Sequence, residues 1–241
     1  MGTDPQSLLN FNYFTVRENT SKIPFHVGTS ADIDFLFEKT RVSVDYRLLV
    51  EKASSELIFF RFRAPAEGIW KIIVEPTRLI NGDFHIWLPV TEFLDGEVYF
   101  LESDPYTTLT NPANAPSPLT VSYYDGSNGA VAQASGRGYT ATGLIKPDFV
   151  APGVDVYGVR AGGGYTTRTG TSVAAAHAAG AAALLLTWGV TDGNLPYMGT
   201  NEVKSVLIRG AKRENSTVYP NNIYGYGKMD VIEAFNKLRT G

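Results

Sequence analysis

The sequence predicts an all-β domain over residues 8–105 followed by an α/β domain over residues 106–240. Before residue 105, apolar and polar side chains alternate, which is the pattern of half-buried strands. After it, short apolar stretches and glycine-rich loops lead into three helical segments, which is typical of an α/β domain. A chain of 241 residues is long enough for two domains, since one domain usually takes roughly 100–200 residues.

The composition is that of a folded protein and excludes several functional classes. Hydrophobic residues make up 44% and charged residues 19%, so extended disorder is not expected. The absence of cysteine excludes a disulfide scaffold, a thiolate zinc site and a cysteine nucleophile. A net charge of −3 gives no electrostatic signature for nucleic acid or an anionic membrane. No apolar run reaches about 18 residues, so no membrane span is expected.

The alternation in the first domain is clearest in four places. It runs through Ile33, Phe35 and Phe37, through Val42, Val44 and Tyr46, through Ile58, Phe60 and Phe62, and through Ile72 and Val74. An Asn81-Gly82 turn, which is a strong hairpin signal, lies further along. We therefore predict seven or eight short strands and no helix, arranged as a β-sandwich or jelly roll.

The aromatic and histidine side chains of this domain have structural and functional interpretations. Trp70 and Trp87 are expected to fill the core between two sheets, although exposed tryptophans also line carbohydrate-binding grooves. His26 and His85 lie in strand-like surroundings. We expect both to be structural rather than catalytic or metal-binding.

The second domain is predicted to contain buried strands near residues 119–121 and 149–154. Three helices are predicted, at about 172–188, 201–212 and 230–238, with Thr200 as the N-cap of the second. We expect no cofactor. A structural calcium ion is left open, because Asp192-Gly193-Asn194 offers oxygen ligands, but such runs are usually plain turns.

The first of these helices begins with a serine in an unusual setting. Gly170-Thr171-Ser172 places the Ser172 hydroxyl near free backbone N–H groups and the positive end of the helix dipole. That field favours a developing oxyanion nearby. On helix rules alone, an N-cap role for Ser172 is the simpler explanation. The alanine-rich stretch that follows is small on every face, which predicts a central helix packed closely on all sides.

Four motifs occur in order within residues 109–239. They are Pro112-Ala113-Asn114-Ala115, Lys146-Pro147-Asp148-Phe149-Val150-Ala151-Pro152-Gly153-Val154, Gly170-Thr171-Ser172 with the alanine-rich helix, and Gly225-Tyr226-Gly227-Lys228-Met229-Asp230. Together they resemble the nucleophile-bearing part of the subtilisin-like serine proteases (subtilases).

This resemblance implies a serine-type endopeptidase in which Ser172 attacks the scissile carbonyl and forms an acyl-enzyme. His177 matches a helix histidine that is structural in the family, and its spacing of five residues does not bring it onto the Ser172 hydroxyl. Ala176 stands where the family usually has proline, which is a departure in helix geometry rather than in chemistry.

A narrower resemblance concerns the first domain. Ile69-Trp70-Lys71 and Phe84-His85-Ile86-Trp87-Leu88-Pro89 resemble parts of a jelly-roll insertion in clostridial subtilisin-like proteases, including the germination-specific proteases of spores. The resemblance implies that residues 8–105 are such an insertion. It also implies a bacterial protein that is extracellular or spore-associated.

The motifs that carry the family's catalytic Asp and His and its oxyanion Asn do not precede Ser172. Asp34 and Asp45 lack the matching context, and Gly193-Asn194 follows the serine. We therefore expect the C-terminal portion of a protease, inactive alone, with a polypeptide substrate and a separate N-terminal half as partners. It would be a fragment, one chain of a cleaved enzyme, or a pseudoprotease.

Two further expectations complete this interpretation. An incomplete α/β domain leaves a sheet edge and part of its core uncovered, which predicts self-association of the fragment. The alternative function is a non-catalytic binding or pseudoprotease module that uses the β-sandwich for protein or glycan contacts. Ser172 distinguishes the two, since a binding module would tolerate alanine there.

Overall fold

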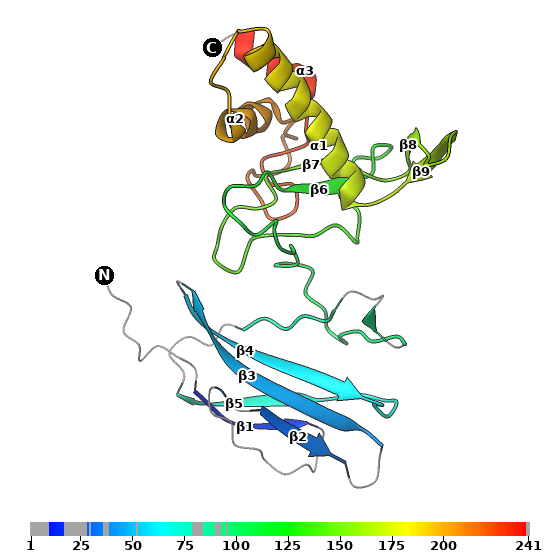
Figure 1. The fold of residues 1–241 in the computed structure, drawn as a ribbon, viewed down its shortest axis with the longest axis vertical. Coiled ribbons are helices and arrows are strands. Elements are labelled where there is room, and N and C mark those ends of the chain that lie inside the picture. The colour runs from blue at the N-terminus through cyan, green and yellow to red at the C-terminus, as the bar shows by residue number, and fades with distance from the viewer. Residues whose placement is uncertain are drawn as a thin grey trace. The chain divides into compact units, whose positions relative to one another are not determined.

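A computed structural model describes residues 10–16, 28, 30–35, 39–51, 53–78, 84–89, 93–94 and 96–239 (Figure 1). The chain divides into two compact units, Met1–Glu97 and Val98–Gly241. Separate clusters of buried side chains stabilise the two units.

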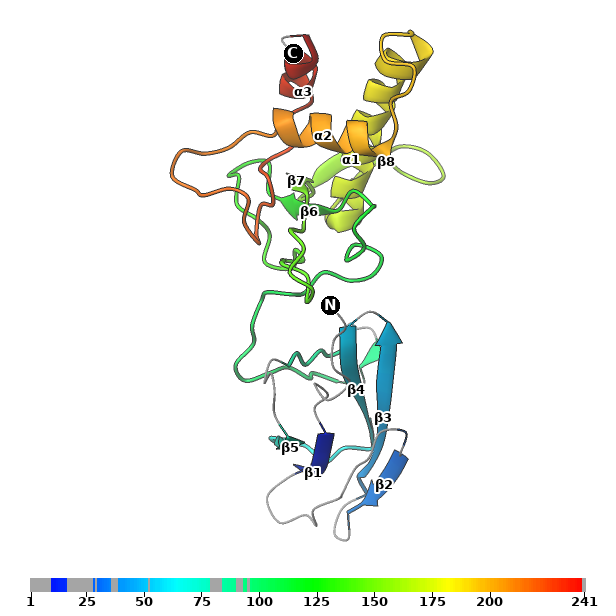
Figure 2. The ribbon, with the colours of Figure 1, turned by 90° about the vertical axis from the view of Figure 1, so that its left-hand side faces the viewer.

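The first unit is built from antiparallel strands, drawn in blue and cyan in Figures 1 and 2. β2 (Ser30–Asp34), β3 (Arg41–Glu51) and β4 (Ala53–Arg63) form a sheet in the order β2-β3-β4. β1 (Asn10–Val16) pairs with β5 (Ile72–Arg78) in a second sheet. The described part of this unit contains five strands and no α-helix. Packing of the two sheets as a sandwich or jelly roll stays a prediction.

The alternation in the sequence correctly predicts which face of the larger sheet is buried. Val42, Val44 and Tyr46 on β3 are almost completely buried, and Val44 lies opposite Phe60 while Tyr46 lies opposite Ile58. The partly buried side chains around them belong to β2, β4 and the adjoining segments. Because side chains alternate across a strand, the intervening polar residues point to the other face.

The two tryptophans have different environments. Trp70 packs edge-to-face against Phe35 and Phe62, at centroid distances of 5.4 and 5.3 Å, and its indole N–H donates to the Ala66 carbonyl. Trp87 is 58% exposed and stacks on His85. The prediction of a core role is therefore wrong for Trp87, because the 84–89 segment is not part of a β-ladder. His26 and the Asn81-Gly82 turn lie outside the described residues.

The second unit places helices around a short parallel strand pair. β6 (Val121–Tyr124) pairs with β7 (Phe149–Pro152). The long helix α1 (Thr171–Leu186) passes close to both strands in Figures 1 and 2 and continues into a π-helical turn, η3 (Thr187–Thr191). α2 (Thr200–Gly210), α3 (Val231–Arg239) and the hairpin of β8 (Val156–Val159) with β9 (Tyr165–Arg168) complete the unit. Phe149, Leu185, Leu207 and Ala234 are completely buried in its main core.

The helix starts differ slightly from those predicted. The N-cap of α2 is Gly199 rather than Thr200, so the prediction was one residue late. A glycine has no capping side chain, but the Glu202 carboxylate accepts a hydrogen bond from the Gly199 N–H at 2.9 Å. This is one half of a capping box.

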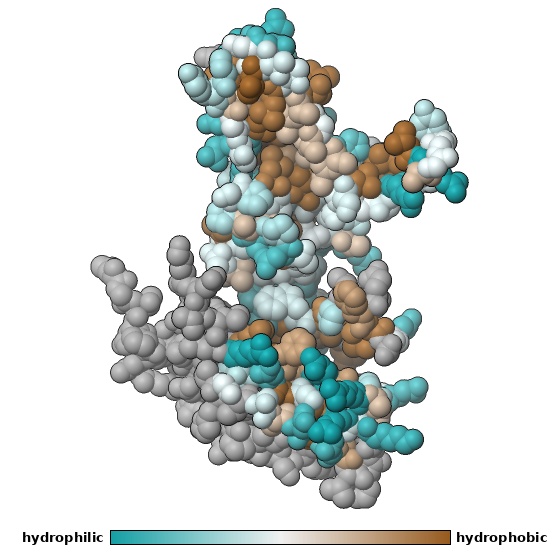
Figure 3. Space-filling view, viewed as in Figure 1, coloured by the Kyte–Doolittle hydropathy of each residue, from teal (hydrophilic) through white to brown (hydrophobic). Residues whose placement is uncertain are grey.

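Only one stripe of α1 is covered within the unit. Ala174, Ala178, Ala181 and Leu185 are buried, whereas the side chains on the other faces are largely exposed, including Ala175, Ala176, Ala179, Ala183, Leu184 and Leu186. Figure 3 shows hydrophobic side chains along this helix. The prediction of burial on every side is therefore wrong for this chain, because no element of the described part packs on the second face.

The helix that carries this exposed face has the length and composition of a membrane-spanning helix. Thr171–Thr191 is one helical stretch of 21 residues that is long and apolar enough to cross a membrane, and 28% of its most apolar 18 residues is buried. Its apolar residues do not form an unbroken run, because His177 lies among them. Length and composition are weak evidence, since the core helix of a globular α/β protein passes the same test. Packing of one stripe against β6 and β7 favours a core helix.

Two glycine substitutions test this packing, and we expect them to change the free energy of unfolding in opposite directions. At Gly210, an added Cβ would collide with the backbone of Ala234 where α2 crosses α3. We expect Gly210→Ala to lower the free energy of unfolding by roughly 1–3 kcal/mol through overpacking. At Gly180, on the exposed face of α1, no atom lies within 4 Å of the added Cβ. Gly180→Ala should raise stability by roughly 0.5–1 kcal/mol because alanine favours the helix.

Urea unfolding followed by circular dichroism measures both variants. Equal stability of wild type and Gly210→Ala would contradict the close α2–α3 contact.

Candidate active site

Ser172 lies in the first turn of α1 and is exposed to solvent. The N-cap is Gly170, with φ 146° and ψ 169°, and it makes no side-chain capping bond. Ser172 is therefore the second residue of the helix and not its N-cap, so the capping explanation of this serine is wrong. The first N–H groups of the helix, in the turn that contains Ser172, have no intrahelical acceptor.

The first turn of α1 packs closely against β6 and β7. Ala174 is completely buried and lies in one cluster with Tyr123 of β6 and Ala151 of β7. An alanine is small enough to bring the helix axis close to the strands. The positive end of the helix dipole then lies at the end of the parallel strand pair, where it favours negative charge.

His177, the described histidine on the same helix, is not placed as a base for Ser172. The Nδ1 atom of His177 lies 3.2 Å from the Val173 carbonyl oxygen, one turn earlier in the same helix. His85 belongs to the other unit and stacks on Trp87. Among the described residues, no side chain forms a hydrogen bond with the Ser172 hydroxyl.

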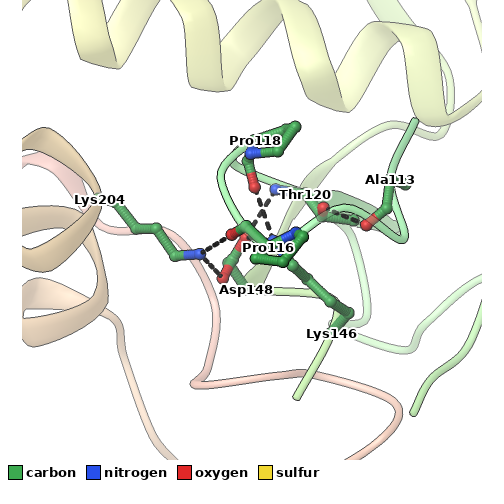
Figure 4. Close-up of polar contacts among 7 residues, drawn as sticks. All are labelled: Ala113, Pro116, Pro118, Thr120, Lys146, Asp148 and Lys204. Atoms are coloured by element: carbon green, nitrogen blue, oxygen red, sulfur yellow. Dashed lines mark hydrogen bonds and ion pairs between the residues drawn. The ribbon is translucent and has the colours of Figure 1, made fainter. Parts of the chain in front are cut away.

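The strand under the helix is held by a buried ion-pair cluster, shown in Figure 4. The Lys146 ammonium donates to Asp148 Oδ2 at 2.8 Å and to the Pro118 carbonyl at 2.6 Å, and the Lys146 and Asp148 side chains are both 2% exposed. Asp148 Oδ2 also accepts from the Thr120 N–H, and Asp148 Oδ1 pairs with Lys204 of α2 at 2.7 Å. One carboxylate therefore joins three segments: the chain before β6, the start of β7, and α2.

The ionisation of this cluster follows from its burial. Burial lowers the pKa of Lys146, while the Asp148 carboxylate beside it acts in the opposite direction. The direct contacts to a carboxylate and a carbonyl favour the charged ammonium. The cluster is structural, because its charges are satisfied internally.

A metal site is not evident in the described part of the chain, where no three His, Asp or Glu side chains cluster. The 192–194 segment forms a turn in which the Asn194 amide donates to the Trp188 carbonyl and Gly193 has a φ of 76°. This hydrogen bond and this turn give the segment a structural role at the end of the helix.

Comparison with known proteins identifies the family. A family model described as "Subtilase family" matches residues 101–227, which is more than half of the chain. The chain belongs to the subtilase family. The matched range includes all four sequence motifs except the end of the last, and it contains Ser172.

Individual relatives support the assignment. The chain is 32% identical over 143 residues to the serine protease AprX of Bacillus subtilis, and 33% identical over 122 residues to subtilisin E of the same organism. Each alignment covers 51% of this chain, but only 30% of AprX and 27% of subtilisin E. The subtilase chain therefore spans less than a third of these relatives.

A solved structure extends the likeness to both units. The CspB protease of Clostridium perfringens superposes with a TM-score of 0.82 at 28% identity, over 95% of this chain and 50% of CspB. This member of the subtilase family therefore spans about half the length of CspB.

Sequence reasoning missed the ion-pair cluster around Asp148. The Lys146-Pro147-Asp148 motif was available as part of the family pattern, but a lysine and an aspartate two residues apart do not reveal that both are buried. The partners Thr120, Pro118 and Lys204 come from distant segments, so only the fold brings them together.

The substitution Asp148→Asn tests the cluster. It leaves the buried Lys146 ammonium without a counter-ion, so we expect the free energy of unfolding to fall by about 3–5 kcal/mol. Asp192→Asn, at an exposed aspartate of the same unit, is the matched control and should change stability by less than about 0.5 kcal/mol. Urea unfolding measures both, and similar values for the two variants would contradict a charged, buried pair.

Proposed function

We propose that this chain carries the nucleophile of a serine endopeptidase and that the nucleophile is Ser172. The observation that carries the proposal is the position of this serine within the subtilase match, exposed in the first turn of a helix that packs on a parallel strand pair. An exposed hydroxyl at that position has access to a substrate carbonyl.

Besides the nucleophile, peptide hydrolysis requires a base and groups that stabilise the oxyanion. The Ser172 oxygen forms a bond to the scissile carbonyl carbon while its proton passes to a base. The helix-terminal N–H groups favour the oxyanion that develops. Collapse of the tetrahedral intermediate releases the amine with that proton, and water then hydrolyses the acyl-enzyme. His177 contacts the Val173 carbonyl oxygen of its own helix and does not serve as this base.

We propose that the base and its orienting acid come from an N-terminal half of the catalytic domain. The coverage of CspB leaves half of that chain unmatched. The uncovered face of α1, with Ala175, Ala179 and Ala183, is apolar and closely approachable, as an internal helix of a larger domain would be. We assign this face to the missing half.

The residues 8–105 then form an insertion of jelly-roll type within the catalytic domain. Its support is the antiparallel strand pattern of the first unit and the likeness to CspB across both units. We also propose a bacterial, extracellular or spore-associated setting and a polypeptide substrate. The bacterial relatives support the bacterial origin, and the subtilase family supports the polypeptide substrate.

A second function has one supporting observation. Trp87 is exposed and stacked on His85, which is the kind of aromatic surface that binds a sugar face. A non-catalytic module that binds glycan or protein through the first unit would depend on Trp87 and not on Ser172.

Substitution of the nucleophile separates these functions. In the protein that carries both halves of the catalytic domain, Ser172→Ala should lower kcat for peptide hydrolysis by about 10⁶-fold. Ser216→Ala, in an exposed loop, is the control and should leave kcat unchanged. Retention of more than about a tenth of the activity by Ser172→Ala would exclude this serine as the nucleophile.

A reactive probe tests the need for the missing half. The chain alone should react slowly with a fluorophosphonate, because an unassisted serine hydroxyl is a weak nucleophile. The protein with both halves should be labelled rapidly and stoichiometrically at Ser172. Rapid labelling of the chain alone, located by peptide mass spectrometry, would show that it contains its own base or obtains one from a second copy.

A further inference from the structure

We infer that Asp155 and Thr169 are positioning residues that hold the turn before Ser172 in the geometry needed for attack. The inference rests on the proposed role of Ser172. It concerns the two segments that meet beside the nucleophile, the chain after β7 and the chain before α1.

The turn before Ser172 needs an anchor of its own. Downstream of the serine, Ala174 is buried against β6 and β7, and this contact positions the first turns of the helix. Upstream, Gly170 has a φ of 146°, a region that glycine enters freely. Packing of the helix therefore leaves the direction of the 169–171 segment undetermined.

Hydrogen bonds supply that anchor. The Gly170 N–H donates to the Gly153 carbonyl at 2.8 Å. The Asp155 N–H donates to the Thr169 hydroxyl oxygen at 2.9 Å, and the same hydroxyl donates to Asp155 Oδ1 at 3.3 Å. The two chain segments are therefore joined at two neighbouring points: by the backbone bond between Gly170 and Gly153, and by the side-chain bonds between Thr169 and Asp155.

Steric limits make this contact specific. A Cβ at Gly153 would lie 2.8 Å from the Gly170 carbonyl oxygen and 2.6 Å from Tyr123 Cβ. The two segments are therefore as close as backbones without a side chain allow. A small shift of the turn would be carried directly to Ser172, two residues beyond Gly170.

Asp155 has a second unusual property. Its φ is +48°, in a region that non-glycine residues seldom adopt, although aspartate tolerates it better than most. A residue in this conformation persists only where its surroundings hold it, and such residues gather at functional sites. The two hydrogen bonds to Thr169 are the described contacts that hold it.

The contact contributes little to stability but sets geometry. Asp155 and Thr169 are both exposed, so water replaces their hydrogen bonds at small cost. Attack on a carbonyl is far more sensitive, because a misplacement of about 1 Å can cost about 10²-fold in rate. A positioning role therefore predicts a loss in kcat without a matching loss in folding.

The test uses the protein with both halves and compares Thr169→Val with Thr169→Ser. Valine keeps the shape of threonine and removes the hydroxyl, and we expect it to lower kcat and the rate of fluorophosphonate labelling about tenfold with KM unchanged. Serine keeps the hydroxyl and should restore both rates to within about twofold of wild type. The melting temperature of Thr169→Val should fall by no more than about 4 °C.

Two further variants keep the test decisive. Thr167→Val, on β9 two residues before Thr169, is the control and should retain the wild-type kcat. Asp155→Gly suits the positive φ and so should fold even if Thr169→Val does not. It removes the carboxylate acceptor and keeps the Asp155 N–H that donates to Thr169, and we expect a threefold to tenfold loss in kcat.

The outcomes separate this inference from the proposed function. If Ser172→Ala abolishes activity but Thr169→Val and Asp155→Gly turn over at the wild-type rate, the positioning role is overturned and the nucleophile stands. If the rate falls only in proportion to lost folded protein, a merely structural role is shown and the inference again fails. If Ser172→Ala remains active, both claims fail together.

Discussion

The close approach of α1 to the β6–β7 strand pair is the constraint on which the second unit depends. Ala174 and Ala151 are completely buried at this contact, and larger side chains would force the helix away from the strands. Because the helix is pressed so close, its N-terminus lies at the end of β7. The position of Ser172, and the direction of the segment that precedes it, follow from this contact.

The strand pair is held by a buried ion-pair cluster in addition to backbone hydrogen bonds with residues 227–229. Two strands present few backbone hydrogen bonds, but Asp148 joins β7 to the chain before β6 and to α2. A buried carboxylate between two ammonium groups is stable only when every partner is in place. The cluster therefore adds a requirement for one arrangement of these segments to the constraints of hydrophobic packing and backbone pairing.

Sequence reasoning recovered the local structure well and the long-range structure in part. Alternation at Val42, Val44 and Tyr46 identifies the buried face of β3 because side chains alternate strictly along a strand. The motifs around Gly170-Thr171-Ser172 give the family because their order and spacing are specific. The environment of Trp87 and the contacts of Asp148 were missed, since both depend on which distant segments cover them.

The uncovered face of α1 connects the fold to the function. A helix that is small and apolar on all sides has the composition of an internal helix, but only the stripe through Ala174, Ala178, Ala181 and Leu185 is buried within this unit. We propose that this face is covered by the N-terminal half of the catalytic domain, which would also supply the base. The same account explains why Ser172 is exposed without a hydrogen-bonding partner in the described chain.

The most direct test of this account is to trap the covalent intermediate. The protein with both halves is mixed with a peptide ester, quenched in acid within milliseconds, digested and examined by mass spectrometry. The account predicts that the peptide containing Ser172 gains the mass of the acyl group. An acyl group on a different residue, or turnover of the ester with no acylated peptide during a kinetic burst, would contradict it.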